Sequence, residues 1–356
     1  MLGIDRFDPP HALGSSHGET RVTRKAYFED PRYVPLLERS FLRYRTLEEE
    51  VGRPLFQPTL GLHFGPSTHD ALRAVEAAAK QHGLAHQRLS ADDVARRFAI
   101  CPASGDVAVL EEEAGVLAAE PMVAAFLEVA QKYGATRLSG VRVIAIEAGD
   151  GDAVVRTDTE VFRAARVVLS TGAWSAEAAL VPVPVPLTVE RQVQLWFAPR
   201  DAAQFMPERF PIFIRFGEDA AFYGLPLVPR FGGLSARAVK VCAHHGGLLT
   251  TADALDRTVT SDDERQVREF VDVHLPQLGA IVESRVCMYT NTPDENFVIG
   301  PHPEIPRVIL ACGFSGHGFK LAPAVGELVR DQVMHGTAPL ALFDPRRFAV
   351  AQSVAR

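Results

Sequence analysis

The feature that most constrains the fold is the apolar run at residues 307–313, RVILACG, which leads straight into a glycine-rich loop at 314–320. A run that is apolar on both faces is typical of a strand covered on both sides, as in a parallel sheet. A second such run, residues 166–170, also ends in a glycine-containing turn, and a helical pattern at 321–333 follows the loop. Together they predict an α/β core whose loop aims backbone N–H groups and a helix dipole at a ligand.

The rest of the chain divides into helical and β-rich stretches. Apolar spacing and end signals predict helices at residues 67–83 and 121–134. From Gln192 to Thr290 alternating segments predominate, which predicts an antiparallel or mixed sheet carrying a substrate site. Between these regions, the prolines of Val181–Pro186 exclude helix and central strand and predict an extended crossover at a domain boundary.

Composition excludes several function classes. With 356 residues, of which 47% are hydrophobic, the chain is long enough for two interleaved domains. The net charge is −7 and the basic residues are scattered, so a nucleic-acid partner is not expected. No signal-peptide core and no run of ~20 apolar residues is found, so we expect a cytoplasmic protein. The four cysteines form no CxxC or zinc spacing, so neither a disulfide framework nor a metal site is expected.

The loop by itself leaves a hydrolase open as an alternative. Residues 313–317, GFSGH, come close to the G-x-S-x-G nucleophile elbow, in which Ser315 would attack the substrate. His317 stands where the elbow has its last glycine, and little chain remains after the loop to supply an acid and a histidine.

A second reading comes from several segments taken together. Residues 313–320, GFSGHGFK, and 286–295, VCMYTNTPDE, resemble the signatures of the monomeric sarcosine oxidase and N-methyltryptophan oxidase family. Residues 7–24 resemble the flavin-contacting loop of that family, and residues 238–247 resemble its oxygen-site strand. These segments follow the family order from Leu2 to about Phe343.

The resemblance implies an FAD-binding, Rossmann-like domain of the glutathione-reductase type, interleaved with a mixed or antiparallel β-sheet substrate domain. The FAD-binding domain would take residues 1–57, 121–190 and 293–356, and the substrate domain residues 58–120 and 191–292. The implied activity is oxidation of an N-methyl or cyclic amino acid by O₂, which for sarcosine gives glycine, formaldehyde and hydrogen peroxide. The implied cofactor is FAD, and the implied state is a monomer.

Two residues of the β-rich region carry implied roles in flavin chemistry. Cys287 matches the cysteine that forms a thioether to the flavin, a reaction that needs an accessible thiolate. A free cysteine in a strand is otherwise usually a small buried hydrophobe. Lys240 matches the lysine that activates oxygen, and a fixed cation there would lower the barrier to forming superoxide.

The substrate anchors implied by the resemblance lie far apart in the sequence. Arg24 and Lys320 match the pair that holds the substrate carboxylate, a task suited to a guanidinium and a point charge. They can meet only if the first and last segments of the chain lie together. Tyr223 and His244 match side chains that line the substrate pocket and orient the amine.

The other cofactor contacts implied by the resemblance extend from the adenosine to the flavin ring. Asp5, at the end of the strand-like run 2–5, matches the acid that binds the ribose. His17 and Arg21 match groups beside the flavin ring. The remaining contacts, to which Lys320 also belongs, are Val143, Thr171, Gly172, Gly316, His317 and Gly318.

The sequence departs from the family at its start. The G-x-G-x-x-G strand-turn-helix, which cradles the FAD pyrophosphate, is absent, and the chain begins at the second strand of the fold. A parallel sheet without its central strand has unpaired backbone edges, so we expect the natural start to lie upstream or the sequence to be a fragment. If the natural protein does start at Met1, the alternative function is that of a non-catalytic flavoprotein homologue. The spacing from Tyr223 to Lys240 is also longer than in the family.

Overall fold

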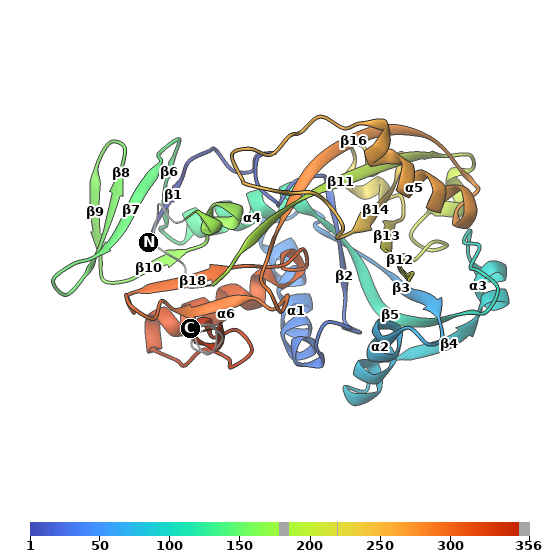
Figure 1. Cartoon of the computed structure of the whole chain (residues 1–356), viewed down its shortest axis with the longest axis horizontal. Coiled ribbons are helices and arrows are strands. Elements are labelled where there is room, and N and C mark those ends of the chain that lie inside the picture. The colour runs from blue at the N-terminus through green and yellow to red at the C-terminus, as the bar shows by residue number, and fades with distance from the viewer. Residues whose placement is uncertain (178–184, 219, 349–356) are drawn as a thin grey trace, which may run out of the picture.

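The computed structural model describes residues 1–177, 185–218 and 220–348 (Figure 1). Its largest sheet has ten strands, in which β3 pairs with β12 in parallel and the other described pairs are antiparallel. The strands are β2 (Thr20–Arg24), β3 (Phe56–Pro66), β4 (His86–Ser90), β5 (Asp106–Ala118), β11 (Thr188–Pro199), β12 (Ile212–Phe216), β13 (Ala221–Leu225), β14 (Val239–His244), β15 (Leu249–Thr250) and β16 (Leu278–Asn291).

Three smaller sheets lie beside the end of the large one (Figure 1). Strand β1 (Leu2–Asp5) pairs in parallel with β6 (Thr136–Ser139), and β10 (Val167–Leu169) pairs in parallel with β18 (Val308–Cys312). The third sheet is an antiparallel meander of β7, β8 and β9. Strand β17 pairs with β18 in antiparallel orientation. These remaining strands are β7 (Val143–Ala148), β8 (Ala153–Thr157), β9 (Val161–Ala164) and β17 (Val298–Pro301).

The helices cover these sheets. Helices α1 and α6 pack against each other on the side of β17 and β18, and α5 packs on the large sheet against β11 and β14 (Figure 1). The helices are α1 (Val34–Val51), α2 (Asp70–Gln81), α3 (Ala91–Arg97), α4 (Ala119–Lys132), α5 (Ser261–His274) and α6 (Ala322–His335). The short 3-10 turns are η1 (Pro31–Tyr33), η2 (Gly172–Ala176), η3 (Ala202–Phe205), η4 (Pro229–Phe231), η5 (Phe319–Leu321) and η6 (Pro345–Phe348).

The predicted core elements are present. The two apolar runs form the parallel pair β10–β18, and the three predicted helices are α2, α4 and α6. Proline in the first turn of α6 and Gly336 in the left-handed conformation after its last turn set the ends of that helix. The α/β prediction with a mixed sheet is therefore confirmed. Residues 181–184 of the predicted proline-rich crossover lie outside the described residues.

Other features differ from the sequence expectation. Helix α1 was not predicted from the sequence, although Leu37, Phe41 and Tyr44 recur at helical spacing and are buried. Strand β1 forms, but Leu2 is 40% exposed. In β10, Val168 is also 40% exposed, so the prediction that this strand is covered on both faces is wrong. Among the described strands, β1 pairs only with β6 and β10 only with β18, so both have one uncovered edge. The predicted domain boundaries stay a prediction.

None of the helices formed by the described residues combines the length and apolar character needed to cross a bilayer. The main core instead lies between the large sheet and α5. In this core Phe222 and Phe270 stack at 4.3 Å between ring centroids, and Phe213 is fully buried against Phe270.

Replacing Phe213 with alanine is expected to lower the free energy of unfolding by about 3–5 kcal/mol, because the ring leaves a cavity that the sheet cannot fill. Urea unfolding followed by circular dichroism measures this change. Leu248→Ala is the control, because Leu248 is 76% exposed and its replacement is expected to change stability by less than about 0.5 kcal/mol. Equal effects of the two variants would contradict this assignment of the core.

Candidate active site

Arg24, the last residue of β2, is buried and fully engaged. Its Nη2 donates to both carboxylate oxygens of Glu29, at 2.7 and 2.8 Å, and its Nη1 donates to the Ala26 carbonyl at 3.0 Å. The guanidinium carbon lies 4.2 Å from the centre of the Tyr27 ring and 4.4 Å from that of Phe28. The planar group is therefore held by aromatic faces as well as by hydrogen bonds.

Lys320, in η5, lies against the same tyrosine. Its Nζ is 5.3 Å from the centre of the Tyr27 ring and donates to the His317 carbonyl at 2.8 Å. Burial, followed by the nearby charge of Arg24, lowers the pKa of Lys320 to about 7. The structure thus brings together two basic residues from opposite ends of the sequence.

Glu29 balances this buried positive charge. Burial by itself would raise the pKa of Glu29, but Arg24, and after it His317 and Lys320, lower that pKa to about 2. Glu29 was not identified from the sequence, because one acid in the short segment after β2 carries no periodic signal. Its position five residues after Arg24 is the only local hint.

A second group of basic residues surrounds the loop before β2. Lys240, on β14, is buried, and its Nζ donates to the carbonyls of Gly18 at 2.9 Å and Thr20 at 3.1 Å. Its Nζ also lies 4.9 Å from the centre of the Trp196 ring. Burial, followed by the charge of Arg21, lowers the pKa of Lys240 to about 7.

Arg21 connects this group to Cys287 on β16. Its Nη2 donates to the carbonyls of Ser15 at 2.6 Å and His17 at 2.5 Å, and lies 3.9 Å from the Cys287 Sγ. The Sγ is also 3.5 Å from the Ser15 carbonyl oxygen. Cys287 is buried and the loop before β2 covers its sulfur, so the accessibility expected of a thiolate that forms the thioether is not found in this structure.

The glycine-rich loop joins the two groups. The ring of His317 is fixed through Nδ1 to the Tyr27 hydroxyl at 2.6 Å and through Nε2 to the Glu295 carbonyl at 2.9 Å. Burial lowers the pKa of His317 to about 4, so its imidazole is neutral at physiological pH. Gly316 has φ +74°, and a Cβ there would lie 2.5 Å from the ring of Tyr289. The backbone therefore approaches this ring as only glycine allows.

The chain matches the family model described as FAD dependent oxidoreductase over residues 2–332. It belongs to this family. It is 39% identical to a monomeric sarcosine oxidase of Streptomyces avermitilis, across 99% of this chain and 92% of that protein. It is 32% identical to an N-methyl-L-tryptophan oxidase of Yersinia pestis, across 92% of this chain and 86% of that protein. The family resemblance read from the sequence is confirmed.

Solved structures support the fold alone. The open form of NikD, an amino acid oxidase of nikkomycin biosynthesis, superimposes with a TM-score of 0.81 at 20% identity. The match covers 97% of this chain and 90% of that one. The family match and the relatives confirm FAD as the cofactor, and the superposition supports the fold class.

The residues of this FAD-dependent oxidoreductase fit a flavin ring. His17 is buried, and both of its ring nitrogens have no partner among the described residues. Burial and then Arg21 lower its pKa to about 4, so the neutral imidazole can donate through one nitrogen and accept through the other. Buried polar groups in folded proteins normally have partners, and the polar edge of a flavin would supply one. Lys240, Arg21 and Cys287 border the same region.

The predicted contacts to the rest of FAD lie near the carboxyl ends of parallel strands, where open α/β sheets bind ligands. Asp5 ends β1 and accepts from the Phe7 N–H at 2.8 Å. Thr171 and Gly172 follow β10, and Gly172 has φ +56°. Val143 begins β7 and is half-buried. Gly318 precedes η5, and a Cβ there would lie 2.5 Å from that of Phe314.

A pocket of about 200 Å³ opens beside the Arg24–Glu29 pair. It is lined by Phe28, Glu29, His69, Ala71, Phe216, Ala221, His244, His245, Glu295 and His317. The predicted pocket residue His244 lies on this wall, and its Nδ1 is 3.2 Å from the Tyr289 hydroxyl. Burial lowers the pKa of His244 well below its usual value. The Tyr223 ring lies against His244, with centroids 6.2 Å apart, but does not line the pocket.

His245 also lines this pocket and was missed by the sequence analysis. Its Nδ1 lies 3.1 Å from Glu190 Oε2. Burial is the largest single effect and opposes a charge on this ring, but the hydrogen bond with Glu190 and the negative charges of Glu190, Glu295 and Glu29 together raise the pKa of His245. The pKa values of the two adjacent histidines are therefore shifted in opposite directions. The sequence signal was the dipeptide itself, which does not reveal a buried glutamate on another strand.

The serine hydrolase alternative finds no support in the geometry. Ser315 is buried, and its hydroxyl lies near Thr292 and the Gly313 carbonyl. No histidine or carboxylate is hydrogen-bonded to it among the described residues. A nucleophile elbow instead presents its serine at an exposed turn beside a histidine.

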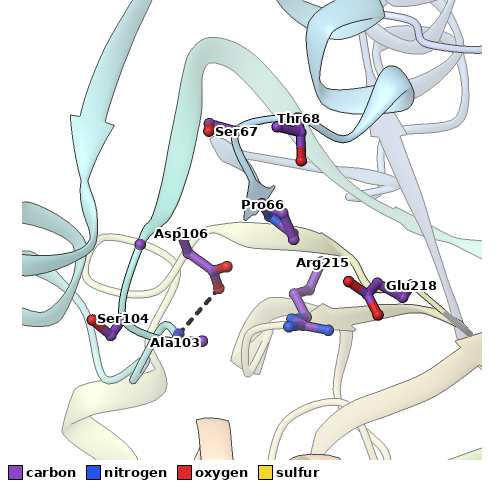
Figure 2. Close-up of a pocket in the computed structure, with 9 residues that line it drawn as sticks. Pro66, Ser67, Thr68, Ala103, Ser104, Asp106, Arg215 and Glu218 are labelled. Atoms are coloured by element: carbon purple, nitrogen blue, oxygen red, sulfur yellow. Dashed lines mark hydrogen bonds between the residues drawn. The ribbon is translucent and has the colours of Figure 1, made fainter.

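A larger hollow, of about 440 Å³, lies elsewhere, at the end of β3 (Figure 2). Figure 2 shows Arg215 beside Glu218, with Asp106 across from them. None of the predicted site residues lines it. Although this hollow is the larger of the two, its lining gives no reason to place flavin chemistry there.

Proposed function

We propose that this protein is an FAD-dependent oxidase of secondary amino acids, chiefly N-methyl amino acids, in the manner of sarcosine oxidase. The names of its relatives support the substrate class. The observation that carries the proposal is the meeting of Arg24 and Lys320 on the Tyr27 ring, beside a pocket that Glu29 and His317 line. The name of the relatives also favours a monomer.

The substrate carboxylate binds to Arg24 and Lys320. Arg24 supplies a planar donor group and Lys320 a point charge, which together fix one end of the amino acid. Glu29 holds the guanidinium in the absence of substrate and also lines the pocket. Because Glu29 already holds the guanidinium, Arg24 is in position before the substrate arrives. The substrate carboxylate then competes with Glu29 for Arg24.

The amine end lies toward uncharged side chains. Burial keeps His244 and His317 neutral, so neither repels the amine nor competes for the carboxylate. Tyr289, hydrogen-bonded to His244, completes this wall. These groups orient the nitrogen without acting as obligatory bases.

FAD, when bound, accepts two electrons from the N-alkyl carbon and passes them to O₂. His17 and Arg21 would line the flavin ring, and Cys287 would provide the sulfur for a thioether. Lys240 places a cation where oxygen is reduced, which lowers the barrier to superoxide. The substrate loses a hydride and a proton to become an imine, and water releases formaldehyde and the demethylated amino acid. Oxygen takes up two electrons and two protons as hydrogen peroxide.

A peroxide assay with sarcosine, N-methyl-L-tryptophan and L-proline tests the function. The FAD-loaded protein is expected to give equal amounts of peroxide and formaldehyde with an N-methyl substrate. Lys320→Met is expected to raise KM about 10- to 100-fold, as the loss of a charged hydrogen bond does. Lys80→Met is the control, since Lys80 is exposed and pairs with Glu76. No peroxide from any secondary amino acid would reject the proposal and favour the non-catalytic homologue.

Replacing Lys240 with methionine is expected to slow reoxidation by oxygen by about 10²–10³-fold, because the fixed charge at the site of oxygen reduction is lost. Anaerobic reduction by substrate is expected to change only a few-fold. Stopped-flow absorbance measures the two half-reactions separately. Equal slowing of both would contradict the assigned role.

The oxygen reaction is also expected to depend on pH. With the pKa of Lys240 at about 7, the side chain is cationic below pH 7 and loses its charge as the pH rises through that value. Reoxidation in the wild type should therefore slow as the pH rises through about 7, while Lys240→Met should lose this dependence. A wild-type profile that rises through this range would contradict the electrostatic role.

Acid precipitation tests the Cys287 linkage. The precipitated wild-type protein is expected to keep its yellow colour, whereas Cys287→Ser should release free flavin to the supernatant, because an oxygen does not replace the thiolate in this reaction. Cys101→Ser is the control, because Cys101 is an exposed free cysteine. Free flavin from the wild type would show that the cofactor is not covalently bound.

A further inference from the structure

A buried carboxylate lies directly behind the Arg24 anchor. Glu111, on β5, is 1% exposed, and its Oε2 accepts from the backbone N–H groups of Lys25 and Ala26, both at 2.9 Å. Its Oε1 lies 2.8 Å from Nε2 of His63, which is fully buried on β3. Its hydrogen-bond partners among the described residues are therefore in the segment after Arg24 or on the neighbouring strand β3.

The sheet is built around this carboxylate. The register of β3 and β5 shifts between Thr59 and Gly61, and Gly61 pairs with Glu111. A Cβ at position 61 would lie 2.8 Å from Glu111 Cγ and 3.0 Å from its Oε1. The glycine and the irregular register thus leave the space that the side chain fills.

Glu111 accepts the backbone hydrogen bonds of the two residues that follow the last β2–β5 pair. Strands β2 and β5 pair from Thr20 to Arg24, so the N–H groups of Lys25 and Ala26 lie beyond the last ladder pair. Buried N–H groups need an acceptor, and one carboxylate oxygen serves both. The turn that follows Arg24 is therefore fixed by a side chain of another strand.

The same turn fixes the guanidinium. The Ala26 N–H binds Glu111, and the Ala26 carbonyl accepts from Arg24 Nη1 at 3.0 Å. The next two residues, Tyr27 and Phe28, supply the rings beside the guanidinium. A shift of this backbone would move one hydrogen-bond acceptor and both rings of the anchor together.

His63 in turn fixes Glu111. Its Nδ1 is buried and has no partner among the described residues. The neutral tautomer with its proton on Nε2 leaves no N–H unpaired and donates that proton to Glu111. The imidazole therefore donates one hydrogen bond, from Nε2, and this bond holds the Glu111 carboxylate next to the backbone of Lys25 and Ala26.

We propose that Glu111, held by His63, is a positioning residue that sets Arg24 in place for the substrate carboxylate. The inference rests on the proposed function, in which Arg24 binds that carboxylate. Glu111 itself does not line the pocket beside Arg24. It acts through the backbone of Lys25 and Ala26.

Glu111→Gln and Glu111→Ala test the proposal in the FAD-loaded protein, with the secondary amino acid that is oxidised fastest. The glutamine variant keeps the size of the side chain but weakens its hydrogen bonds, and KM is expected to rise about fivefold. The alanine variant removes both acceptors, and KM is expected to rise about tenfold or more. The value of kcat should stay within about twofold of the wild-type value, because Arg24 binds the substrate carboxylate equally in the ground state and in the transition state.

Glu113→Gln is the matched control. Glu113 lies two residues along the same strand, but its exposed carboxylate pairs with the side-chain Nζ of Lys25 at 2.8 Å and not with the backbone. This variant is expected to keep the wild-type KM. A Glu111→Gln protein with wild-type KM, or a Glu113→Gln protein with the same rise, would overturn the proposal. If Glu111→Ala does not fold, the comparison of the two glutamine variants decides.

A double-mutant cycle with Arg24→Lys separates positioning from general destabilisation. Because Glu111 acts through the guanidinium, Glu111→Gln is expected to change KM by less than about twofold in the Arg24→Lys background. A full fivefold rise there would show that Glu111 does not act through Arg24. If Arg24→Lys alone leaves KM unchanged, the carboxylate anchor of the proposed function fails, whatever the result for Glu111.

Discussion

The site depends on the stable burial of two cations around one tyrosine ring. Arg24 and Lys320 both lie against Tyr27, where their mutual repulsion and loss of water oppose their charges. Glu29 supplies the opposing charge, and its lowered pKa is the direct sign of that balance. Below about pH 7, where Lys320 is charged, two buried cations with one carboxylate leave positive charge for a second carboxylate, which an amino acid provides.

The flavin side of the site is positive for a different purpose. Lys240 and Arg21 lie on strands that are far apart in the order of the large sheet, β14 and β2, yet both donate to backbone carbonyls of residues 15–20. The loop before β2 also covers the sulfur of Cys287. One short segment is thus held in place by the residues to which we assign flavin attachment and oxygen reduction. Arg24, which anchors the substrate, is the last residue of β2, the strand that follows this loop. The substrate anchor and the flavin side of the site are therefore positioned by one continuous segment.

Local sequence carried much of this prediction. The runs that became β10 and β18 are apolar on both faces, and the glycine-rich loop follows β18 as the pattern indicates. Lys240 stood out because its neighbours in the strand are apolar, and it is buried in the structure. Helix α1 was missed although its apolar spacing is helical, and the exposure of Leu2 was not foreseen because it depends on which strands flank β1.

The partners of the charged groups could not be predicted in the same way. Glu29, Glu111 and His245 were all missed, and each is defined by a contact that no residue periodicity encodes. Glu111 is 85 to 86 residues from the N–H groups it binds, and its place depends on a register shift opposite Gly61. His245 differs from its neighbour His244 because Glu190, on another strand, lies beside one ring and not the other.

The sequence by itself determined the family, the cofactor and the residue types available for chemistry, because these follow from motifs and from apolar patterns that are local in the chain. The tertiary structure decided which charges neutralise each other and which remain for a ligand. Charge balance depends on distance and burial, and the distance between Arg24 and Lys320 is set by how the two ends of the chain pack on Tyr27.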